Sequence, residues 1–304
     1  MSILADRRSN AARSANVMTL SGTAAASCHG LRRPSNRLGA MSGIGLSVLP
    51  RDTARRPIDP RPVQLAKRAL LLLTGPIVFL FLACVPQICG KRRGFRGWYW
   101  RTVKRACDWL LWMLSIKVTM SDADRATLAA DENSIIVINH RSHLDGFTLM
   151  VTVPDEKWFT FAAKKELFDA RLLSTGFKGA GLVEIDRASG KVALQTLSNA
   201  VKDMSPRRSV VLFPEGTRTQ SDTLGPFKAG AVLVARETGR VIRPILIHHS
   251  EYLLPHGKVF PYSGTLHVEV LEPFQPTSGS DIQEETGRLR RQLVNAFEAG
   301  RTVR

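Results

Sequence analysis

The sequence predicts an α/β fold, in which a largely parallel sheet is flanked by helices and preceded by an N-terminal membrane-associated helical segment. After Met120, short apolar and β-branched runs alternate with stretches of helical character, and this alternation is typical of a layered α/β fold. Before it, the run from Ala69 to Cys89 carries no charge and is close to the roughly 20 residues that span a bilayer as a helix. We therefore expect the folded domain after Met120 and the membrane contact before it.

Each β-branched run after Met120 has the length of a single strand. Strands are expected near residues 135–139, 158–162, 182–185, 209–213, 241–247 and 266–270. Helices are expected at residues 146–152, 164–173, 191–204, 229–238 and 281–299. In α/β sheets ligands bind beyond the carboxyl ends of the strands, so polar residues at those ends are the first candidates for a site.

Length and charge limit the class of protein. A chain of 304 residues suits one domain of roughly 200 residues with additional segments. The formal net charge of +17 favours a negatively charged partner. No nucleic-acid-binding motif is present, so we expect no nucleic acid partner. The 4 cysteines match no zinc or disulfide spacing.

Residues 1–62 are expected to form a disordered basic extension. This segment contains no Lys and no Glu and is rich in Arg, Ser and Ala. The same composition is typical of organelle transit peptides and of disordered tails near anionic lipid, and it fits both.

Residues 63–116 are expected to anchor the chain to a membrane. The apolar run is a candidate spanning helix, but Pro76 and Pro86 each remove a helical hydrogen bond, so an in-plane or re-entrant hairpin is an alternative. A buried core helix is a further alternative. Residues 94–116 then combine Trp and Tyr with Arg and Lys, as interfacial helices do.

Basic residues also suggest which side of the membrane the domain occupies. Lys91, Arg92 and Arg93 follow the apolar run, where positive charge is heavier than before it. The positive-inside tendency then places residues 117–304 in the cytoplasm. We expect the bacterial inner membrane, or an organelle membrane if residues 1–62 are a transit peptide.

His140 and Asp145 are the candidate catalytic pair. His140 directly follows the strand expected to end at Asn139. A histidine there can act as a general base on a hydroxyl, while a carboxylate fixes its tautomer and stabilises the imidazolium. On one continuous helix these positions would point about 140° apart, so the pair needs a turn that enters a helix. The alternatives are a metal site with His143 and a helix cap by Asp145.

A second polar group follows the strand expected at residues 209–213. Arg218 and Lys228 can present a guanidinium fork and an ammonium group to a phosphate monoester. Arg187 comes directly after another expected strand and adds a third cation. Taken singly, Pro-Glu-Gly at 214–216 also fits a plain turn, and Arg218 also fits a surface salt bridge.

Four blocks together resemble, in order and spacing, the four motifs of the 1-acylglycerol-3-phosphate acyltransferase family. The blocks are Asn139-His140 with Asp145, Gly181 to Arg187, Phe213 to Arg218, and Val241 to Ile245. The stretch from Phe161 to Phe168 is similar to the bacterial members. The resemblance covers about residues 116–274 and leaves the first sixty or so outside.

The resemblance implies a role for each matching residue. His140 would be the general base and Asp145 its orienting partner, with no acyl-enzyme intermediate. The acceptor-binding residues would be Arg187, Glu215, Gly216, Thr217 and Arg218, beside Lys228. Pro244 and Ile245 would line the acyl side. No metal and no organic cofactor are implied, and acyl-CoA or acyl carrier protein would supply the acyl group.

Residues 117–304 are thus expected to be an acyltransferase domain that converts lysophosphatidic acid to phosphatidic acid. Arg218 with Lys228 favours a phosphate-bearing acceptor. Family members that acylate other lysophospholipids or lyso-ornithine lipid share the His and Asp block, so such an acceptor is the alternative. A non-catalytic membrane-surface binding protein is the alternative from a different class. The basic charge suits an anionic acyl carrier, an anionic acceptor and the membrane lipid around them.

Overall fold

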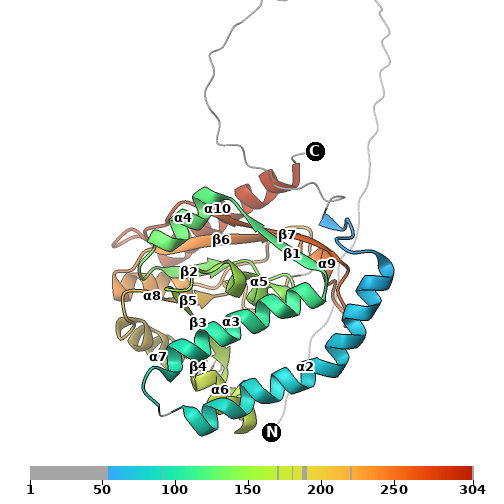
Figure 1. The fold of residues 1–304 in the computed structure, drawn as a ribbon. Helices are drawn as coiled ribbons and strands as arrows, with labels where there is room; N and C mark the ends of the chain where they lie inside the picture. The colour runs from blue at the N-terminus through green and yellow to red at the C-terminus, as the bar shows by residue number, and fades with distance from the viewer. Residues whose placement is uncertain are drawn as a thin grey trace, which may run out of the picture. The chain divides into compact units, whose positions relative to one another are not determined.

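The computed structural model describes residues 54–90, 92–169, 171–179, 181–186, 190–219 and 221–302. Most of the expected N-terminal extension lies outside these residues. The described chain folds around a seven-stranded sheet with the strand order β1-β7-β6-β2-β5-β3-β4 (Figure 1). The strands are β1 (Ile116–Met120), β2 (Ile135–Ile138), β3 (Trp158–Lys164), β4 (Val183–Ile185), β5 (Arg208–Leu212), β6 (Ile242–His248) and β7 (Gly264–Val270).

Neighbouring strands in this sheet run parallel, except for the antiparallel pair β6 and β7. The prediction of a largely parallel sheet is therefore confirmed. β2 lies between β5 and β6, so its carboxyl end is flanked by the carboxyl ends of two parallel neighbours. This places the segments after β2 and β5 at one edge of the sheet.

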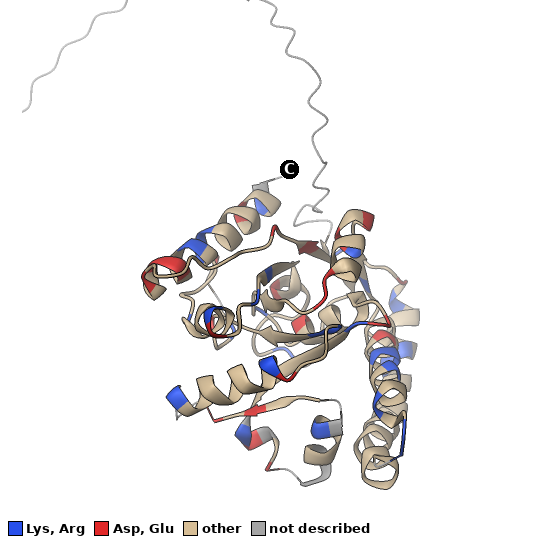
Figure 2. Ribbon diagram, turned by 90° about the vertical axis from the view of Figure 1, so that its left-hand side faces the viewer, with Lys and Arg blue, Asp and Glu red and all other residues tan. Residues whose placement is uncertain are grey.

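Helices cover both faces of the sheet (Figures 1 and 2). The helices are α2 (Arg61–Cys89), α3 (Phe95–Met113), α4 (Asp122–Ala130), α5 (Leu144–Thr152), η1 (Lys165–Leu167), α6 (Arg171–Gly179), α7 (Gly190–Lys202), α8 (Gly230–Thr238), α9 (Ser250–Leu253) and α10 (Ile282–Thr302). On one face α7, α8 and α10 supply the buried apolar side chains, for example Val201, Val232 and Leu293. On the other face they come from α3, α4 and α5, for example Trp100 and Leu149.

One expected helix was wrong, and one strand was not predicted. No single helix occupies residues 164–173, because β3 continues to Lys164 by pairing with β4. A 3-10 turn and then α6 follow instead. The edge strand β1 was not predicted, although its residues Ile-Lys-Val-Thr-Met alternate apolar and polar side chains, as expected of a strand that is covered on one side only.

The apolar run forms part of one continuous helix, α2, which passes through Pro76 and Pro86 without a break. The hairpin alternative is therefore wrong for this structure. The helix is long and apolar enough to cross a membrane, and only 11% of its most apolar 18-residue window is buried. The alternative of a buried core helix is accordingly wrong as well.

Helix α3 lies closer to the core than expected. Trp100 is only 2% exposed, stacks on Trp158 and donates from Nε1 to the Lys157 carbonyl at 3.2 Å. The buried Lys104 ammonium bonds to the Asp155 carboxylate at 2.6 Å. Tyr99 and Trp100, two of the aromatic residues that suggested an interfacial helix, thus pack inside the domain, whereas Trp98 and Trp112 are 44% and 55% exposed.

Candidate active site

Asn139 ties the end of β2 to its neighbour β6. Its side-chain Nδ2 donates to the Ile247 carbonyl at 2.9 Å, and its Oδ1 accepts from the Ile247 N–H at 2.8 Å. The side chain thus continues the hydrogen-bonded ladder for one step after the strand has ended. The next residue, His140, leaves the sheet from a fixed position.

His140 and Asp145 meet through a strand, a turn and a helix, as the spacing required. His140 Nδ1 lies 3.0 Å from Asp145 Oδ2, and Asp145 stands in the first turn of α5. The same oxygen also accepts from the N–H groups of Arg141 and Ser142, each at 2.8 Å. Asp145 is fully buried, whereas 23% of the His140 side chain is exposed.

This geometry determines the imidazole tautomer. Because a carboxylate oxygen only accepts hydrogen bonds, Nδ1 carries the hydrogen and Nε2 presents its lone pair. The ring is held on one side by Phe213, whose centroid lies 4.1 Å from that of His140. The helix-cap alternative is wrong, because the N-cap position of α5 is His143, which has no side-chain cap, and Asp145 instead accepts from the N–H groups of Arg141 and Ser142 in the turn before the helix.

Glu215 lies beside His140 but faces backbone rather than open space. Its Oε1 accepts from the His140 N–H at 2.8 Å, and its Oε2 accepts from the Gly225 N–H at 2.9 Å. The residue is 6% exposed. Gly216 follows with a φ of 73°, a conformation that favours glycine.

Arg218 and Lys228 are cations near this turn. Neither makes a side-chain hydrogen bond or ion pair with the residues that the structure describes. A Cβ on Gly216 would lie 2.8 Å from Lys228 Nζ, so the ammonium group lies directly over this glycine. Thr217, which lies between Gly216 and Arg218 in the sequence, is exposed. Burial lowers the pKa of His143, and the positive charge of Arg218, followed by that of His140, lowers it further.

An apolar cavity of about 230 Å³ adjoins Lys228 and Gly216. Its other walls are formed by β3, β4 and the end of β5, and by α7 and α8. Arg187 lies outside the described residues, in the connection between β4 and α7. Of the predicted acceptor-binding residues, Gly216 and Lys228 line this cavity.

Pro244 and Ile245 do not line this cavity or the larger one described below. Ile245 is fully buried in the core, paired with Ile138 of β2. Pro244 is buried on the same strand, and successive residues of a strand point to opposite faces. The structure places both within the sheet, below the site.

Arg141 was missed at the sequence level. It is buried, and its guanidinium donates to the carbonyls of Thr223 at 3.1 Å and Ser221 at 2.6 Å. Together with the bond from the Thr219 N–H to the His140 carbonyl at 2.9 Å, it holds Thr219, Ser221 and Thr223 beside His140 and Asp145. The sequence offers no signal for this, because a buried and an exposed arginine look alike in it.

A second pair was also missed. His248 Nε2 lies 2.8 Å from Glu269 Oε2, and both residues are buried. The sequence had suggested no carboxylate partner for His248. The partner comes from β7, which runs antiparallel to β6, so only the pairing of the strands brings the two together.

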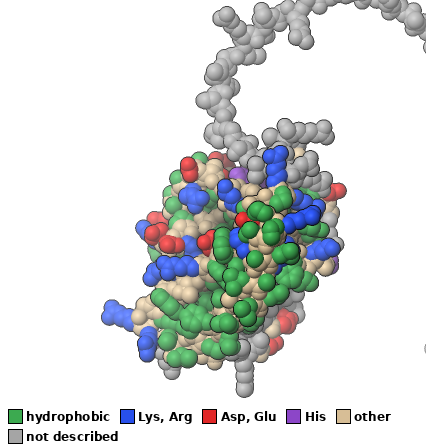
Figure 3. All heavy atoms as spheres, turned by 45° about the vertical axis from the view of Figure 1, so that its right-hand side comes forward, with side chains coloured by type: hydrophobic (Ala, Val, Ile, Leu, Met, Phe, Trp, Pro, Cys, Tyr) green, Lys and Arg blue, Asp and Glu red, His purple; other side chains and the backbone are tan. Residues whose placement is uncertain are grey.

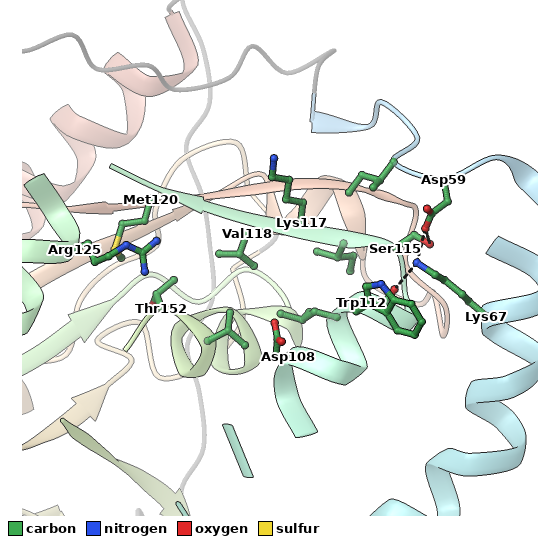
Figure 4. A pocket seen from close by; sticks show the side chains of 14 residues that line it. Asp59, Lys67, Asp108, Trp112, Ser115, Lys117, Val118, Met120, Arg125 and Thr152 are labelled. Carbon is green, nitrogen blue, oxygen red and sulfur yellow. Dashed lines mark hydrogen bonds and ion pairs between the residues drawn. The ribbon is translucent and has the colours of Figure 1, made fainter. Parts of the chain in front are cut away.

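The larger cavity, of about 430 Å³, lies elsewhere, beside the edge strand β1 (Figure 4). There Lys67 and Ser115 both bond to the Asp59 carboxylate at 2.7 Å. None of the predicted site residues lines it. Within the described part of the chain, no group of three or more His, Cys, Asp or Glu side chains is arranged to hold a metal ion.

At the carboxyl edge of the sheet, a buried aspartate therefore orients a histidine, and the next turn carries two cations that have no side-chain partner among the described residues. Residues 117–248 match the Acyltransferase family. Residues 117–248 therefore form a domain of this family, and the resemblance found in the sequence is confirmed.

Similar proteins carry related names. The chloroplastic 1-acyl-sn-glycerol-3-phosphate acyltransferase LPAT1 of Arabidopsis thaliana is 31% identical over 129 residues, which are 42% of this chain and 35% of that protein. The 1-acyl-sn-glycerol-3-phosphate acyltransferase of Borreliella burgdorferi is 25% identical over 64% of this chain and 77% of its own. The human 1-acyl-sn-glycerol-3-phosphate acyltransferase beta is 29% identical over 71% of this chain and 78% of its own.

The fold has a counterpart of known structure. The 1-acyl-sn-glycerophosphate (LPA) acyltransferase PlsC of Thermotoga maritima superposes with a TM-score of 0.58 at 20% identity, over 78% of this chain and 95% of that one. With the chloroplastic relatives of Arabidopsis thaliana and Brassica napus, the match spans only about a third of their length, 35% and 37%. The exposed apolar helix α2 and these relatives together indicate membrane association.

Proposed function

We propose that this chain is a 1-acyl-sn-glycerol-3-phosphate acyltransferase, which transfers an acyl group from a thioester carrier to lysophosphatidic acid and so forms phosphatidic acid. The observation that carries the proposal is the His140–Asp145 pair at 3.0 Å, together with the lack of a partner for Nε2, for the Arg218 guanidinium and for the Lys228 ammonium group among the residues that the structure describes. The names of the similar proteins support the same reaction.

The pair supplies what the reaction needs. The hydroxyl oxygen of the acceptor attacks the thioester carbonyl carbon while His140 Nε2 takes the hydroxyl proton. The tetrahedral intermediate then loses the thiolate, the carbon–sulfur bond breaks, and the proton passes from Nε2 to the sulfur. Asp145 keeps Nδ1 protonated and stabilises the imidazolium in between. No covalent bond to the protein is needed.

The phosphate of the acceptor is assigned to Arg218 and Lys228. A guanidinium can bind two phosphate oxygens at once, and the ammonium group adds a point charge. Both cations lie next to the turn at Gly216, where the absence of a side chain leaves room for Lys228. We assign Arg187 and Thr217 to the same acceptor on the strength of the sequence resemblance.

We propose that acyl-CoA or acyl carrier protein, both anionic thioesters, supplies the acyl group and that no further cofactor takes part. The formal net charge of +17 favours the approach of either donor, because both carry several negative charges. The same charge favours a membrane surface that contains anionic lipid.

We place α2 at the membrane, with the domain on the cytoplasmic side of a bacterial inner membrane or of an organelle membrane. Large apolar side chains along it are exposed, including Leu73 at 71%, Ile77 at 65% and Ile88 at 78% (Figure 3). The helix is attached to the domain near both ends, by Arg68 Nη2 on the Pro261 carbonyl at 2.8 Å and by the Leu82 carbonyl, which accepts from Tyr99 Oη at 2.7 Å. An exposed apolar surface fixed to a folded domain is what an interfacial anchor requires.

The function is tested with purified protein, radiolabelled acyl-CoA and a panel of lysolipids. Lysophosphatidic acid should be acylated fastest, and lyso-ornithine lipid, which has no phosphate, slowest. Faster transfer to a lysolipid without a phosphate monoester would instead support the alternative acceptor. No transfer to any acceptor, with either donor, would support the non-catalytic alternative.

A further inference from the structure

Among the predicted acceptor-binding residues that the structure describes, Glu215 has surroundings that leave it little room to bind an acceptor. Each of its carboxylate oxygens already accepts a backbone hydrogen bond, Oε1 from His140 at 2.8 Å and Oε2 from Gly225 at 2.9 Å. It is 6% exposed. A negative group facing a phosphate would also repel it, so the carboxylate adds nothing to phosphate affinity.

The bond to His140 satisfies a donor that the sheet leaves open. β2 ends at Ile138, so the His140 N–H lies beyond the last pairs with β5 and β6. A buried backbone donor without a partner is costly, and a carboxylate is a strong acceptor for it. The His140 carbonyl is bound from the same side, by the Thr219 N–H at 2.9 Å.

The other end of the carboxylate reaches a second fixed point. Gly225 is adjacent to Leu224, and the carbonyls of both accept from the Arg290 guanidinium of α10, at 2.8 and 2.6 Å. A Cβ on Gly225 would lie 3.1 Å from Glu215 Oε2 and 2.7 Å from Thr219 Oγ1. The close approach of carboxylate and backbone therefore depends on a glycine at this position.

We propose that Glu215 is a positioning residue, which bridges the backbone of His140 to that of Gly225 and so keeps the general base in register with the phosphate-binding turn. The proposal rests on the proposed function only in that acyl transfer is the reaction measured. It removes Glu215 from the set of acceptor ligands and leaves Arg218 and Lys228 in it.

The test compares Glu215→Gln with Glu272→Gln, a change at an exposed glutamate. A glutamine keeps one oxygen for one of the two N–H groups but turns an NH₂ donor toward the other. We expect kcat to fall about 10- to 100-fold, the size of effect that a small misplacement of a catalytic group produces. The acceptor KM should stay within about threefold, because no acceptor contact is lost. Glu272→Gln should change neither.

Hydrogen–deuterium exchange provides a readout that does not depend on activity. In Glu215→Gln, peptides covering residues 139–145 and 221–228 should exchange faster than in the wild type, while the peptides of β7 do not change. If Glu215→Gln does not fold, Gly225→Ala is used in both measurements. The added Cβ would lie 3.1 Å from Glu215 Oε2 and would displace the carboxylate from the backbone N–H of residue 225.

Two results would overturn the proposal. One is an acceptor KM raised tenfold or more with kcat retained, which would return Glu215 to the acceptor ligands. The other is unchanged exchange in both peptides. If wild-type protein acylates no lysolipid, the proposed function fails, and the exchange result alone then decides whether Glu215 has this positioning role.

Discussion

At the scale of single residues, most polar atoms of His140 already have a hydrogen-bond partner. Asp145 holds its Nδ1, Glu215 its N–H and Thr219 its carbonyl, while Phe213 packs on the ring. The remaining polar atom is Nε2. A base with so many contacts is already oriented before the substrate binds. This reduces the loss of entropy on the way to the transition state.

Arg218→Ala should weaken the binding of the acceptor and leave the binding of the acyl donor unchanged. Losing a charge-assisted contact of roughly 1.5–3 kcal/mol corresponds to an acceptor KM raised about 10- to 100-fold. The matched control is Arg207→Ala, an exposed arginine next to the start of β5, at the opposite end of that strand. Steady-state kinetics with both substrates varied would check this. A raised KM for acyl-CoA alone would assign Arg218 to the donor.

The sequence predicted only part of the site, because some of its contacts are local along the chain and others join distant segments. His140 and Asp145 could be paired from their spacing, since a strand, a turn and a helix bring them together locally. The partners of Glu215 lie 75 and 10 residues away along the chain, and both are backbone N–H groups, which carry no signal in the sequence, so the position of Glu215 depended on the assembled loops.

At the scale of helices and strands, α3 shows where composition was misleading. Trp98 and Trp100 lie two residues apart, yet Trp98 is 44% exposed and Trp100 is 2% exposed. Trp and Arg on one helix suit a membrane interface and a packed core equally well. The sheet strands were predictable because each is a continuous apolar run, whereas the burial of α3 depends on how α5 and β3 pack against it.

Trp100→Ala should therefore destabilise the domain by about 3–5 kcal/mol, the range for a fully buried aromatic residue. Trp98→Ala should cost about 1 kcal/mol, because the ring only touches Phe95 and Phe81 at its exposed edge. Chemical unfolding in detergent measures both. Equal losses for the two variants would contradict the packing of α3 described above.

The anchoring role of α2 can be tested without deleting it. Leu72, Leu73, Ile77 and Leu80 are 54–71% exposed, and replacing all four with Gln should release the protein from membranes because each buried apolar side chain contributes roughly 1.5–3 kcal/mol. Val192→Gln, at a 63% exposed residue of α7, is the control. Fractionation would show the variant in the supernatant.

Salt extraction distinguishes the apolar anchor from an electrostatic one. In about 1 M salt exposed charges are screened within about 3 Å, so wild-type protein should stay in the membrane pellet and leave it only in detergent. Release by salt alone, or a fourfold variant that still sediments with membranes, would assign the attachment to basic residues instead.

The whole molecule should lose stability as the pH falls below neutrality. Burial lowers the pKa of His267, which also lies near His248, Glu269 and Asp124. In the unfolded chain the same ring takes up a proton near pH 6.5, before the folded protein does. Its contribution is thus fully present above about pH 6.5 and is lost as the pH falls from there toward the lower folded pKa.

His267→Gln should reduce this acid sensitivity. Its Tm should fall less than that of the wild type between about pH 7 and pH 5, a range above the region where carboxylates titrate. His256→Gln is a control, because His256 is exposed. Parallel Tm curves for wild type and His267→Gln would show that the protonation of His267 is not linked to folding.

The most direct measurement of the central claim is acyl transfer from radiolabelled acyl-CoA to lysophosphatidic acid by wild-type protein, His140→Ala and Asp145→Asn. A positioned base contributes about 10²–10⁴-fold, so His140→Ala should lose at least that part of kcat while it keeps the unfolding midpoint of the wild type. Asp145→Asn should also be impaired, because the amide favours the wrong tautomer and does not stabilise the imidazolium. Transfer by folded His140→Ala within about tenfold of the wild-type rate would contradict the account.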